Sequence, residues 1–197
     1  MATYTDADAR KLVMRDMRLL APGMQERATA FVARCEAAGA PILVWETQRT
    51  HDLARIYYAL KRSNARDGWR TWHFYGLAVD VIHPTRQWVP WESPDQAAVD
   101  WRGRVVEIAR SCGLDWGGDW ISFKDWPHFQ FDTLKPSPSD RSIELYVNHG
   151  IAALWKEVGA LEGAPAASSF APPPNVIADG VADTRRMMNA LGVRKFR

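Results

Sequence analysis

Two short stretches of the chain each combine a histidine with a carboxylate. His73 and Asp80 are seven residues apart with Gly76 between them, and Asp125 precedes His128 by three residues. Two imidazoles and one carboxylate, with a fourth position left open for water, are a typical ligand set of catalytic zinc. The second carboxylate can then move the proton of that water. The pattern therefore predicts a zinc site formed by His73, Asp80 and His128, with Asp125 as the general base.

Two predicted strands can bring these side chains together. Residues 76–82 alternate as a strand does, with Asp80 on one side, and residues 127–132 form a second short strand with His128 near its start. If the two strands pair, the three ligands meet on one face of a sheet. An acid on an otherwise apolar strand face is costly unless it is paired or bound to a metal.

The same residues also have simpler interpretations. A histidine is often an ordinary hydrogen-bonded polar residue, and a spacing of seven from histidine to aspartate arises by chance. The other three histidines, His51, His83 and His149, are interpreted as non-ligands. Among these three, His83 is the best alternative ligand because it follows Asp80 by three residues.

Arg49 follows a predicted buried strand over residues 41–45. At that position its guanidinium can hold a substrate carboxylate or stabilise a developing oxyanion. The alternative is a surface charge at the start of the next predicted helix, over residues 51–62.

Apolar periodicity and capping residues predict the remaining elements. The predicted helices cover residues 7–20, 25–38, 51–62, 94–111, 140–148, 151–158 and 181–191. Pro22 and Gly23 are expected to end the first of these helices. Ser93 is the predicted N-cap of the helix that ends near Ser111. A Pro/Trp loop is expected over residues 83–92 and a glycine-rich turn over residues 114–120.

Composition places the chain among ordinary globular proteins. Its 197 residues suffice for one domain with a sizeable core, and the net charge of +2 with a pI of about 8.6 is mildly basic. This charge suits an anionic partner such as a cell-wall polymer and is too small to indicate nucleic acid. Cys35 and Cys112 are expected to be buried reduced thiols, although a disulfide between them stays an alternative.

The two ends of the chain carry separate expectations. The polar start, Met1 to Asp6, lacks the pattern of a secretory signal, and no apolar run approaches the roughly 20 residues of a membrane span. We therefore expect a cytoplasmic protein without a membrane span, unless another agent releases it. Residues 1–159 are predicted to form the domain that holds the candidate zinc site, and residues 160–197 an Ala/Pro-rich arm that ends in a helix.

The candidate site resembles that of the zinc DD-carboxypeptidase and L-alanyl-D-glutamate endopeptidase family. That family carries Ser-x-His-x-x-Gly-x-Ala-x-Asp and, further on, an acid-x-x-His. The residues that match these motifs are His73, Gly76, Ala78, Asp80, Asp125 and His128. The likeness extends over about residues 25–132 and includes the Trp-Gly-Gly-Asp-Trp segment at residues 116–120.

The resemblance implies a small α+β fold, with an antiparallel sheet flanked by helices, as in Hedgehog-type domains and DD-peptidases. It also implies that His73, Asp80 and His128 bind zinc and that Asp125 is the base. Arg49 becomes a substrate contact. Thr71 stands where the motif has serine, which keeps a hydroxyl for substrate binding and adds a methyl group.

The aspartate at position 125, in place of the glutamate of many dipeptidases, resembles the phage endolysin branch. The expected function is thus hydrolysis of the peptidoglycan stem peptide at the L-Ala–D-Glu bond by a monomeric zinc peptidase, held in the cytoplasm until it reaches the wall. One alternative is a D-Ala–D-Ala carboxypeptidase or dipeptidase. Another is a non-catalytic, zinc-containing module that binds the cell wall.

Overall fold

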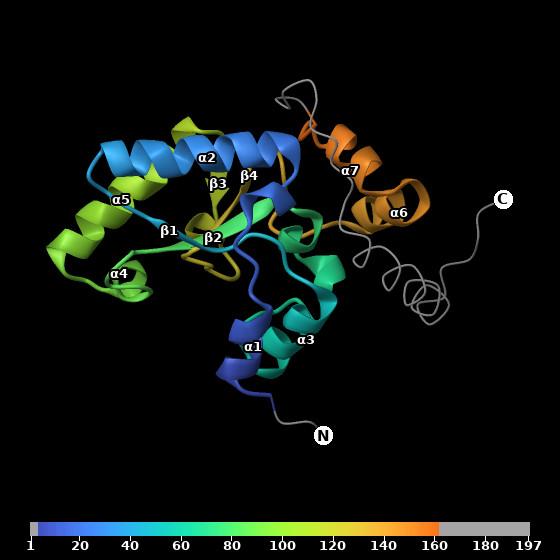
Figure 1. Ribbon diagram of the computed structural model, residues 1–197, viewed down its shortest axis with the longest axis horizontal. Coiled ribbons are helices and arrows are strands. Elements are labelled where there is room, and N and C mark those ends of the chain that lie inside the picture. The colour runs from blue at the N-terminus through green and yellow to red at the C-terminus, as the bar shows by residue number, and fades with distance from the viewer. Residues whose placement is uncertain (1–3, 162–197) are drawn as a thin grey trace.

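A four-stranded antiparallel sheet lies at the centre of the computed structural model, which describes residues 4–161 (Figure 1). The strands are β1 (Leu43–Glu46), β2 (Ala78–Ile82), β3 (Leu114–Trp116) and β4 (His128–Phe131), in the spatial order β1-β2-β4-β3. Every neighbouring pair is antiparallel. The sheet and its surrounding helices confirm the expected α+β class.

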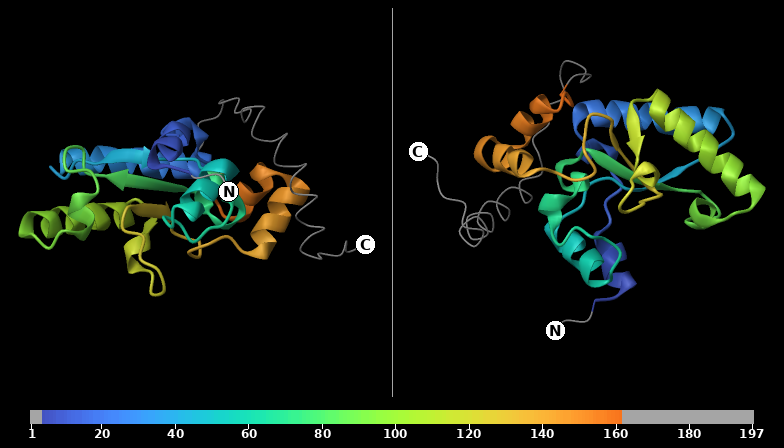
Figure 2. Two further views of the ribbon diagram at one scale, coloured as in Figure 1. Left: turned by 90° about the horizontal axis from the view of Figure 1, so that it is seen from below. Right: turned by 180° about the vertical axis from the view of Figure 1, so that it is seen from behind.

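Helices surround this sheet on several sides (Figures 1 and 2). The helices α2 (Pro22–Ala37) and α5 (Gln96–Ser111) pack together along one side of the sheet, and α1 (Asp6–Leu12) and α3 (His51–Ala59) form a second pair apart from them. The pair α6 (Asp140–His149) and α7 (Ile151–Glu157) packs together along a third side. None of the helices in residues 4–161 is both long and apolar enough to cross a membrane.

One face of the sheet belongs to the main hydrophobic core. Val79 and Val81 of β2 and Phe129 of β4 are fully buried there. The ring of Phe31 from α2 packs against Phe129 with centroids 5.0 Å apart, and Val105 of α5 joins the same cluster. Burial of such side chains contributes roughly 1.5–3 kcal/mol each, so this face anchors the sheet.

The other sheet face carries the polar residues of the candidate site. The register places Asp80 opposite both His128 on β4 and Glu46 on β1, and it places Ala78 opposite Gln130. Because residues directly opposite one another in paired strands share a face, these polar side chains lie together.

A bulge at Trp45 is what brings Glu46 to this face. Val44 pairs with Val81 and Glu46 with Asp80, so two steps along β1 correspond to one step along β2. Without the extra residue, the alternation of side chains would direct Glu46 to the other face of the sheet, away from Asp80. Bulges next to functional sites commonly re-aim a side chain in this way.

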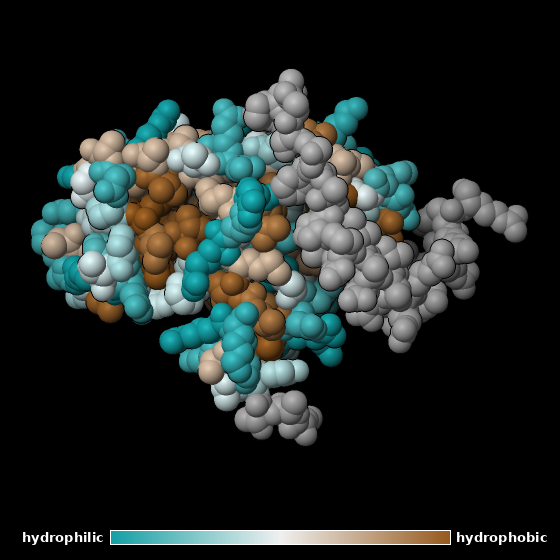
Figure 3. Space-filling model, viewed as in Figure 1, coloured by the Kyte–Doolittle hydropathy of each residue, from teal (hydrophilic) through white to brown (hydrophobic). Residues whose placement is uncertain are grey.

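The strand over residues 43–46 is an edge strand, so the expectation of a buried strand was wrong in part. Leu43 is 46% exposed, whereas all five residues of β2 are buried. Figure 3 shows apolar surface over β1 between α2 and α4 (Val89–Glu92). Trp88, the N-cap of α4, and Val89, its first residue, are exposed, and Trp88 packs edge-on against Trp45.

The N-terminal helix differs from its prediction over residues 7–20. It is α1, which ends at Leu12 because Val13 is extended, and a separate 3-10 turn, Met17–Leu19, follows after Asp16 caps it. The next helix, α2, begins at Pro22 and not at residue 25 as predicted. The first turn of a helix leaves its amide groups unpaired, so proline is tolerated there.

Three further local predictions were wrong. Asp95, not Ser93, is the N-cap of α5, because its carboxylate accepts from the amide of Ala98 at 2.8 Å. The expected loop at residues 83–92 contains the short helix α4. The expected turn at residues 114–120 begins with strand β3, whose Leu114 pairs with Phe131.

The α6–α7 unit is attached to the domain through named contacts. Trp155 of α7 donates from Nε1 to the carbonyl of Tyr75 at 2.8 Å, and Gly23 donates to the carbonyl of Ala160 at 2.7 Å. Ala160 is fully buried. The helix predicted at residues 181–191 and most of the predicted arm lie outside the described residues, so the proposed two-part division stays a prediction.

Candidate metal centre

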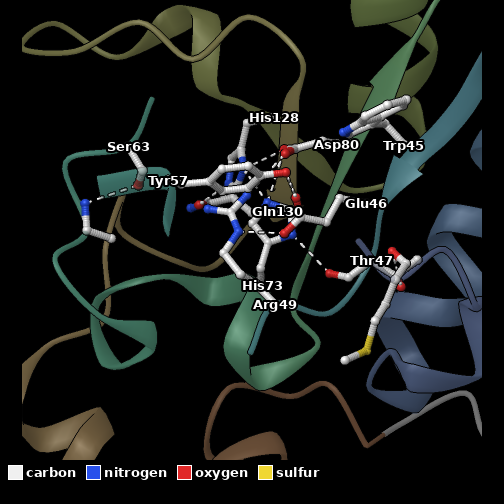
Figure 4. Close-up of polar contacts among 12 residues, drawn as sticks. Trp45, Glu46, Thr47, Arg49, Tyr57, Ser63, His73, Asp80, His128 and Gln130 are labelled. Atoms are coloured by element: carbon white, nitrogen blue, oxygen red, sulfur yellow. Dashed lines mark hydrogen bonds and ion pairs between the residues drawn. The ribbon is translucent and has the colours of Figure 1, made fainter. Parts of the chain in front are cut away.

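Three side chains from separate parts of the sequence converge on the polar face of the sheet (Figure 4). His73 Nε2 lies 3.0 Å from Asp80 Oδ1 and 3.1 Å from His128 Nδ1, and His128 Nδ1 lies 3.2 Å from Asp80 Oδ1. All three residues are buried. They form the one group of ligand-type side chains with metal-binding spacing within residues 4–161.

His73 is held by a short 3-10 helix, Trp72–Tyr75, that ends at Gly76. Gly76 has φ +66°, in the left-handed region that favours glycine, and its amide donates to the carbonyl of His73. A Cβ at this position would lie 2.6 Å from the carbonyl oxygen of Leu19. A glycine is therefore required to turn the chain from His73 into β2.

The hydrogen bond of the other ring nitrogen fixes the tautomer of His73. Its Nδ1 lies 2.9 Å from the carbonyl oxygen of Thr47, which can only accept, so Nδ1 carries the proton. Nε2 then presents a lone pair toward Asp80 and His128. Such a contact to a backbone carbonyl is the usual second interaction of a metal-binding histidine.

Asp80 uses its two carboxylate oxygens differently. Oδ1 faces both histidines, and Oδ2 accepts from Arg49 Nη2 at 3.3 Å. Burial alone would raise the pKa of this carboxyl, but without a metal ion the adjacent imidazoles of His73 and His128, when protonated, hold it well below its ordinary value. Burial would lower the pKa of His128, yet the neighbouring carboxylates of Asp80 and Asp125 favour its protonated form and raise it.

Arg49 in turn is fixed by two residues that sequence reasoning missed. Its Nε donates to Glu46 Oε1 at 2.5 Å, and its guanidinium lies 4.9 Å from the ring centroid of Tyr57. Tyr57 also donates to Glu46 Oε2 at 3.1 Å. Arg49 is only 8% exposed, and attraction to Glu46 and Asp80 overcomes the effect of burial and raises its pKa. The alternative of a surface charge at Arg49 is wrong.

Asp125 lies beside the three converging side chains, at a tight turn that leads into β4. Its carbonyl accepts from the amide of His128 at 3.2 Å, and its amide donates to the carbonyl of Gly117 at 3.1 Å. The side chain is partly buried, and its pKa is raised by that burial and by the negative charge of Asp80. A carboxyl with a raised pKa is a better proton acceptor than an ordinary aspartate.

Close packing accounts for the glycine at position 117 in the Trp-Gly-Gly-Asp-Trp segment. A Cβ there would lie 2.5 Å from the carbonyl oxygen of Asp125 and 3.1 Å from the Cβ atoms of Asp125 and His128. The segment therefore packs directly against the turn that joins these two residues. Trp120, from the same segment, lies with its ring centroid 5.1 Å from that of His128.

The converging atoms fit a divalent ion by both spacing and charge. Ligands at about 2.0–2.1 Å from a tetrahedral zinc lie roughly 3.3 Å from one another, close to the observed separations of 3.0–3.2 Å. Three acidic side chains, Asp80, Glu46 and Asp125, surround a single guanidinium, Arg49, so a divalent cation would balance the surplus of acidic groups. Buried charge without such a partner is costly.

Other residues considered from the sequence lie in varied surroundings. Thr71 is buried two positions before His73, and its carbonyl accepts from the amide of Phe74 at 3.2 Å. Its substrate contact stays a prediction, as does that of Arg49. His51 Nδ1 accepts from the amide of Gly68, and His83 Nδ1 accepts from the amides of Thr85 and Arg86. Cys35 and Cys112 are both free thiols.

Similar proteins were found by sequence and by structure. Residues 64–131 match the family described as D-alanyl-D-alanine carboxypeptidase. An L-alanyl-D-glutamate peptidase of a Listeria phage is 30% identical over 119 residues, which are 60% of this chain and 40% of the phage protein. The peptidoglycan L-alanyl-D-glutamate endopeptidase CwlK of Bacillus subtilis is 31% identical over 123 residues, which are 56% of this chain and 72% of CwlK.

A crystal structure of the L-Ala D-Glu endopeptidase ChiX from Serratia marcescens is similar over 64% of this chain and 84% of that chain, with 23% identity and a TM-score of 0.39. The family resemblance that the motifs predicted is confirmed by the sequence matches, and above all by CwlK, most of whose length this chain covers. The chain belongs to the peptidase family that contains D-alanyl-D-alanine carboxypeptidases and L-alanyl-D-glutamate endopeptidases.

Proposed function

We propose that this chain is a zinc-dependent peptidase that hydrolyses the stem peptide of peptidoglycan at the L-Ala–D-Glu bond. The observation that carries the proposal is the convergence of His73 Nε2, Asp80 Oδ1 and His128 Nδ1 within 3.2 Å of one another, with Asp125 beside them. Two neutral imidazoles with one carboxylate suit zinc better than magnesium or calcium, which prefer oxygen ligands.

His73, Asp80 and His128 would hold the ion. Bound zinc supplies a Lewis acid that acidifies water and polarises a carbonyl group. The carbonyl of Thr47 and the guanidinium of Arg49 contact His73 and Asp80 and keep these two ligands oriented.

Asp125 would carry the protons of the reaction. As water adds to the carbonyl carbon of L-alanine, Asp125 accepts a proton from that water. It then delivers the proton to the nitrogen of D-glutamate while the carbon–nitrogen bond breaks, which leaves a free alanine carboxylate and a free amine. The raised pKa of Asp125 supports this double role, because the carboxyl must both take up and release a proton.

The choice of substrate follows from the relatives. Both the phage peptidase and CwlK are named for the L-alanyl-D-glutamate bond, and the phage relative favours a role as an endolysin. The match to the D-alanyl-D-alanine carboxypeptidase family makes release of terminal D-alanine the second candidate.

Mass analysis of digested peptidoglycan tests the proposal. Purified protein, stripped of metal and then reloaded with zinc, should produce new L-alanine carboxyl ends and D-glutamate amino ends. Release of free D-alanine instead would support the second candidate. Zinc binding without any cleavage would support a wall-binding module and contradict both peptidase activities.

A further inference from the structure

Gln130 is buried on β4, two residues after His128 and on the same sheet face. Its Oε1 lies 3.2 Å from His128 Nε2. Its Nε2 donates to the carbonyl oxygens of Leu134 and Lys135 at 3.1 and 3.0 Å. The proposed reaction gives this side chain no direct part.

The two carbonyl groups determine which way the amide of Gln130 points. If the amide were flipped, its oxygen would face the carbonyl oxygens of Leu134 and Lys135. All three oxygens can only accept hydrogen bonds, so none of them would have a donor. The amide nitrogen must therefore face these carbonyls. The only role left for Oε1 toward His128 is that of an acceptor.

This orientation determines the proton position on His128. Because Oε1 can only accept, the hydrogen bond requires a proton on Nε2 of His128. Nδ1 of the neutral ring then has a free lone pair, and it is Nδ1 that faces Asp80 Oδ1 and His73 Nε2. His73 has the opposite tautomer: its Nδ1 donates to the carbonyl of Thr47, and its Nε2 faces the site.

The carbonyl that orients Gln130 also contacts the segment that carries His73. Lys135 O accepts from Trp72 Nε1 at 2.6 Å as well as from Gln130. One backbone oxygen thus fixes the neighbour of His73 and the amide that orients His128.

We propose that Gln130 is a positioning residue that commits His128 to metal binding through Nδ1. The inference rests on the proposed zinc site but not on the identity of the peptide bond. Loss of such an outer contact typically weakens metal binding by about 10- to 100-fold.

Two substitutions separate this role from simple packing. Gln130→Met keeps a similar volume and has no acceptor, whereas Gln130→Glu keeps an acceptor for His128 Nε2. Both variants lose the donors to Leu134 and Lys135. A purely structural role would therefore be damaged in both, and a role in orienting His128 would be damaged in the Met variant alone.

The experiment measures zinc affinity of the metal-stripped full chain by competition with a chromophoric chelator. Gln130→Met should bind zinc about 10- to 100-fold more weakly than wild type, and Gln130→Glu should stay near wild type. In the zinc-loaded protein, NMR should detect a ring Nε2 proton on His128 that is protected from exchange with water in wild type and Gln130→Glu. That protection should be lost in Gln130→Met.

Equal zinc affinity in wild type and Gln130→Met would overturn the inference, as would equal weakening in both variants. If Gln130→Met fails to fold, the wild-type spectrum still decides, because a His128 ring without a protected Nε2 proton contradicts the proposal. Wild-type protein that binds zinc but cleaves no peptide would refute the proposed function and leave the role of Gln130 intact.

Discussion

Arg49 binds one oxygen of Asp80 and leaves the other to the histidines. Nη2 of Arg49 donates to Oδ2 at 3.3 Å, so Oδ1 alone faces His73 and His128. The guanidinium of Arg49 also donates from Nε to Glu46 Oε1. The bulge at Trp45 directs the side chain of Glu46 into the site. This arrangement favours one-oxygen binding of a metal by Asp80 and ties the backbone of β1 to the site.

Removal of Arg49 should therefore cost stability as well as activity. Arg49→Met leaves Glu46 buried and unpaired, and breaking a buried pair in this way typically costs about 3–5 kcal/mol. Urea unfolding of the metal-free proteins measures the effect. The double variant Glu46→Gln, Arg49→Met should recover much of the loss, because the carboxylate of Glu46 is then no longer left buried without its cation. A double variant no more stable than Arg49→Met would show that Glu46 is not an ionised partner.

Asp125 should be needed for turnover but not for metal binding. Asp125→Ala and Asp125→Asn should lower the rate of stem-peptide cleavage by about 100- to 10,000-fold, because proton transfer is lost. Zinc content, measured by elemental analysis, should stay near one ion per chain. Variants that lose zinc together with activity would mean that Asp125 is a ligand and that the roles assigned to the acids are wrong.

Gly117 should tolerate no side chain. Gly117→Ala places a Cβ 2.5 Å from the carbonyl oxygen of Asp125, so the turn that carries Asp125 and His128 must move. A displacement of roughly 1 Å in a catalytic group can cost about 100-fold in rate. Steady-state cleavage assays of the variant test this expectation.

Gly103 provides the matched control for that substitution. It lies within α5, and a Cβ there would meet nothing within 4 Å. Gly103→Ala should leave activity unchanged and raise stability by about 0.5–1 kcal/mol through helix propensity. Equal activity in the two alanine variants would contradict the close packing of Gly117 against the site.

The two thiols should differ sharply in reactivity. Cys35 is fully buried, and burial together with the nearby thiol of Cys112 raises its pKa to about 12. Since the thiolate is the reactive form, Cys35 should stay protonated and unreactive at pH 8 in the folded protein. Cys112 is partly exposed. An aromatic disulfide reagent should therefore modify one thiol per native chain and none in Cys112→Ser, whereas rapid labelling of Cys112→Ser would contradict the burial of Cys35.

The sequence predicted the convergence of His73, Asp80 and His128 because local rules were sufficient there. Alternation set the face of Asp80, and pairing of the two strands brought His128 opposite it, as the register shows. It did not reveal Glu46, Tyr57 or Gln130 as parts of the site. Alternation does place Gln130 on the same face as His128, but the orientation of its amide depends on carbonyls in a later turn, and the position of Glu46 depends on a bulge. Neither of these two features has a signal in residue periodicity.

Helix ends were predicted less well for a similar reason. Several residues near 93–96 could each cap α5, and only the observed bond from the amide of Ala98 to Asp95 identifies the cap. Strand β3 was missed because three residues between two glycines read as a turn. Its pairing with β4, and not its own sequence, makes it a strand.

The most direct test of the central claim is a calorimetric titration of zinc into metal-stripped protein, with His73→Ala as the comparison. If His73, Asp80 and His128 together bind one divalent ion, wild type should bind one zinc per chain tightly and His73→Ala should lose that binding. Failure of wild type to bind zinc, or binding by His73→Ala with unchanged affinity and stoichiometry, would contradict the account.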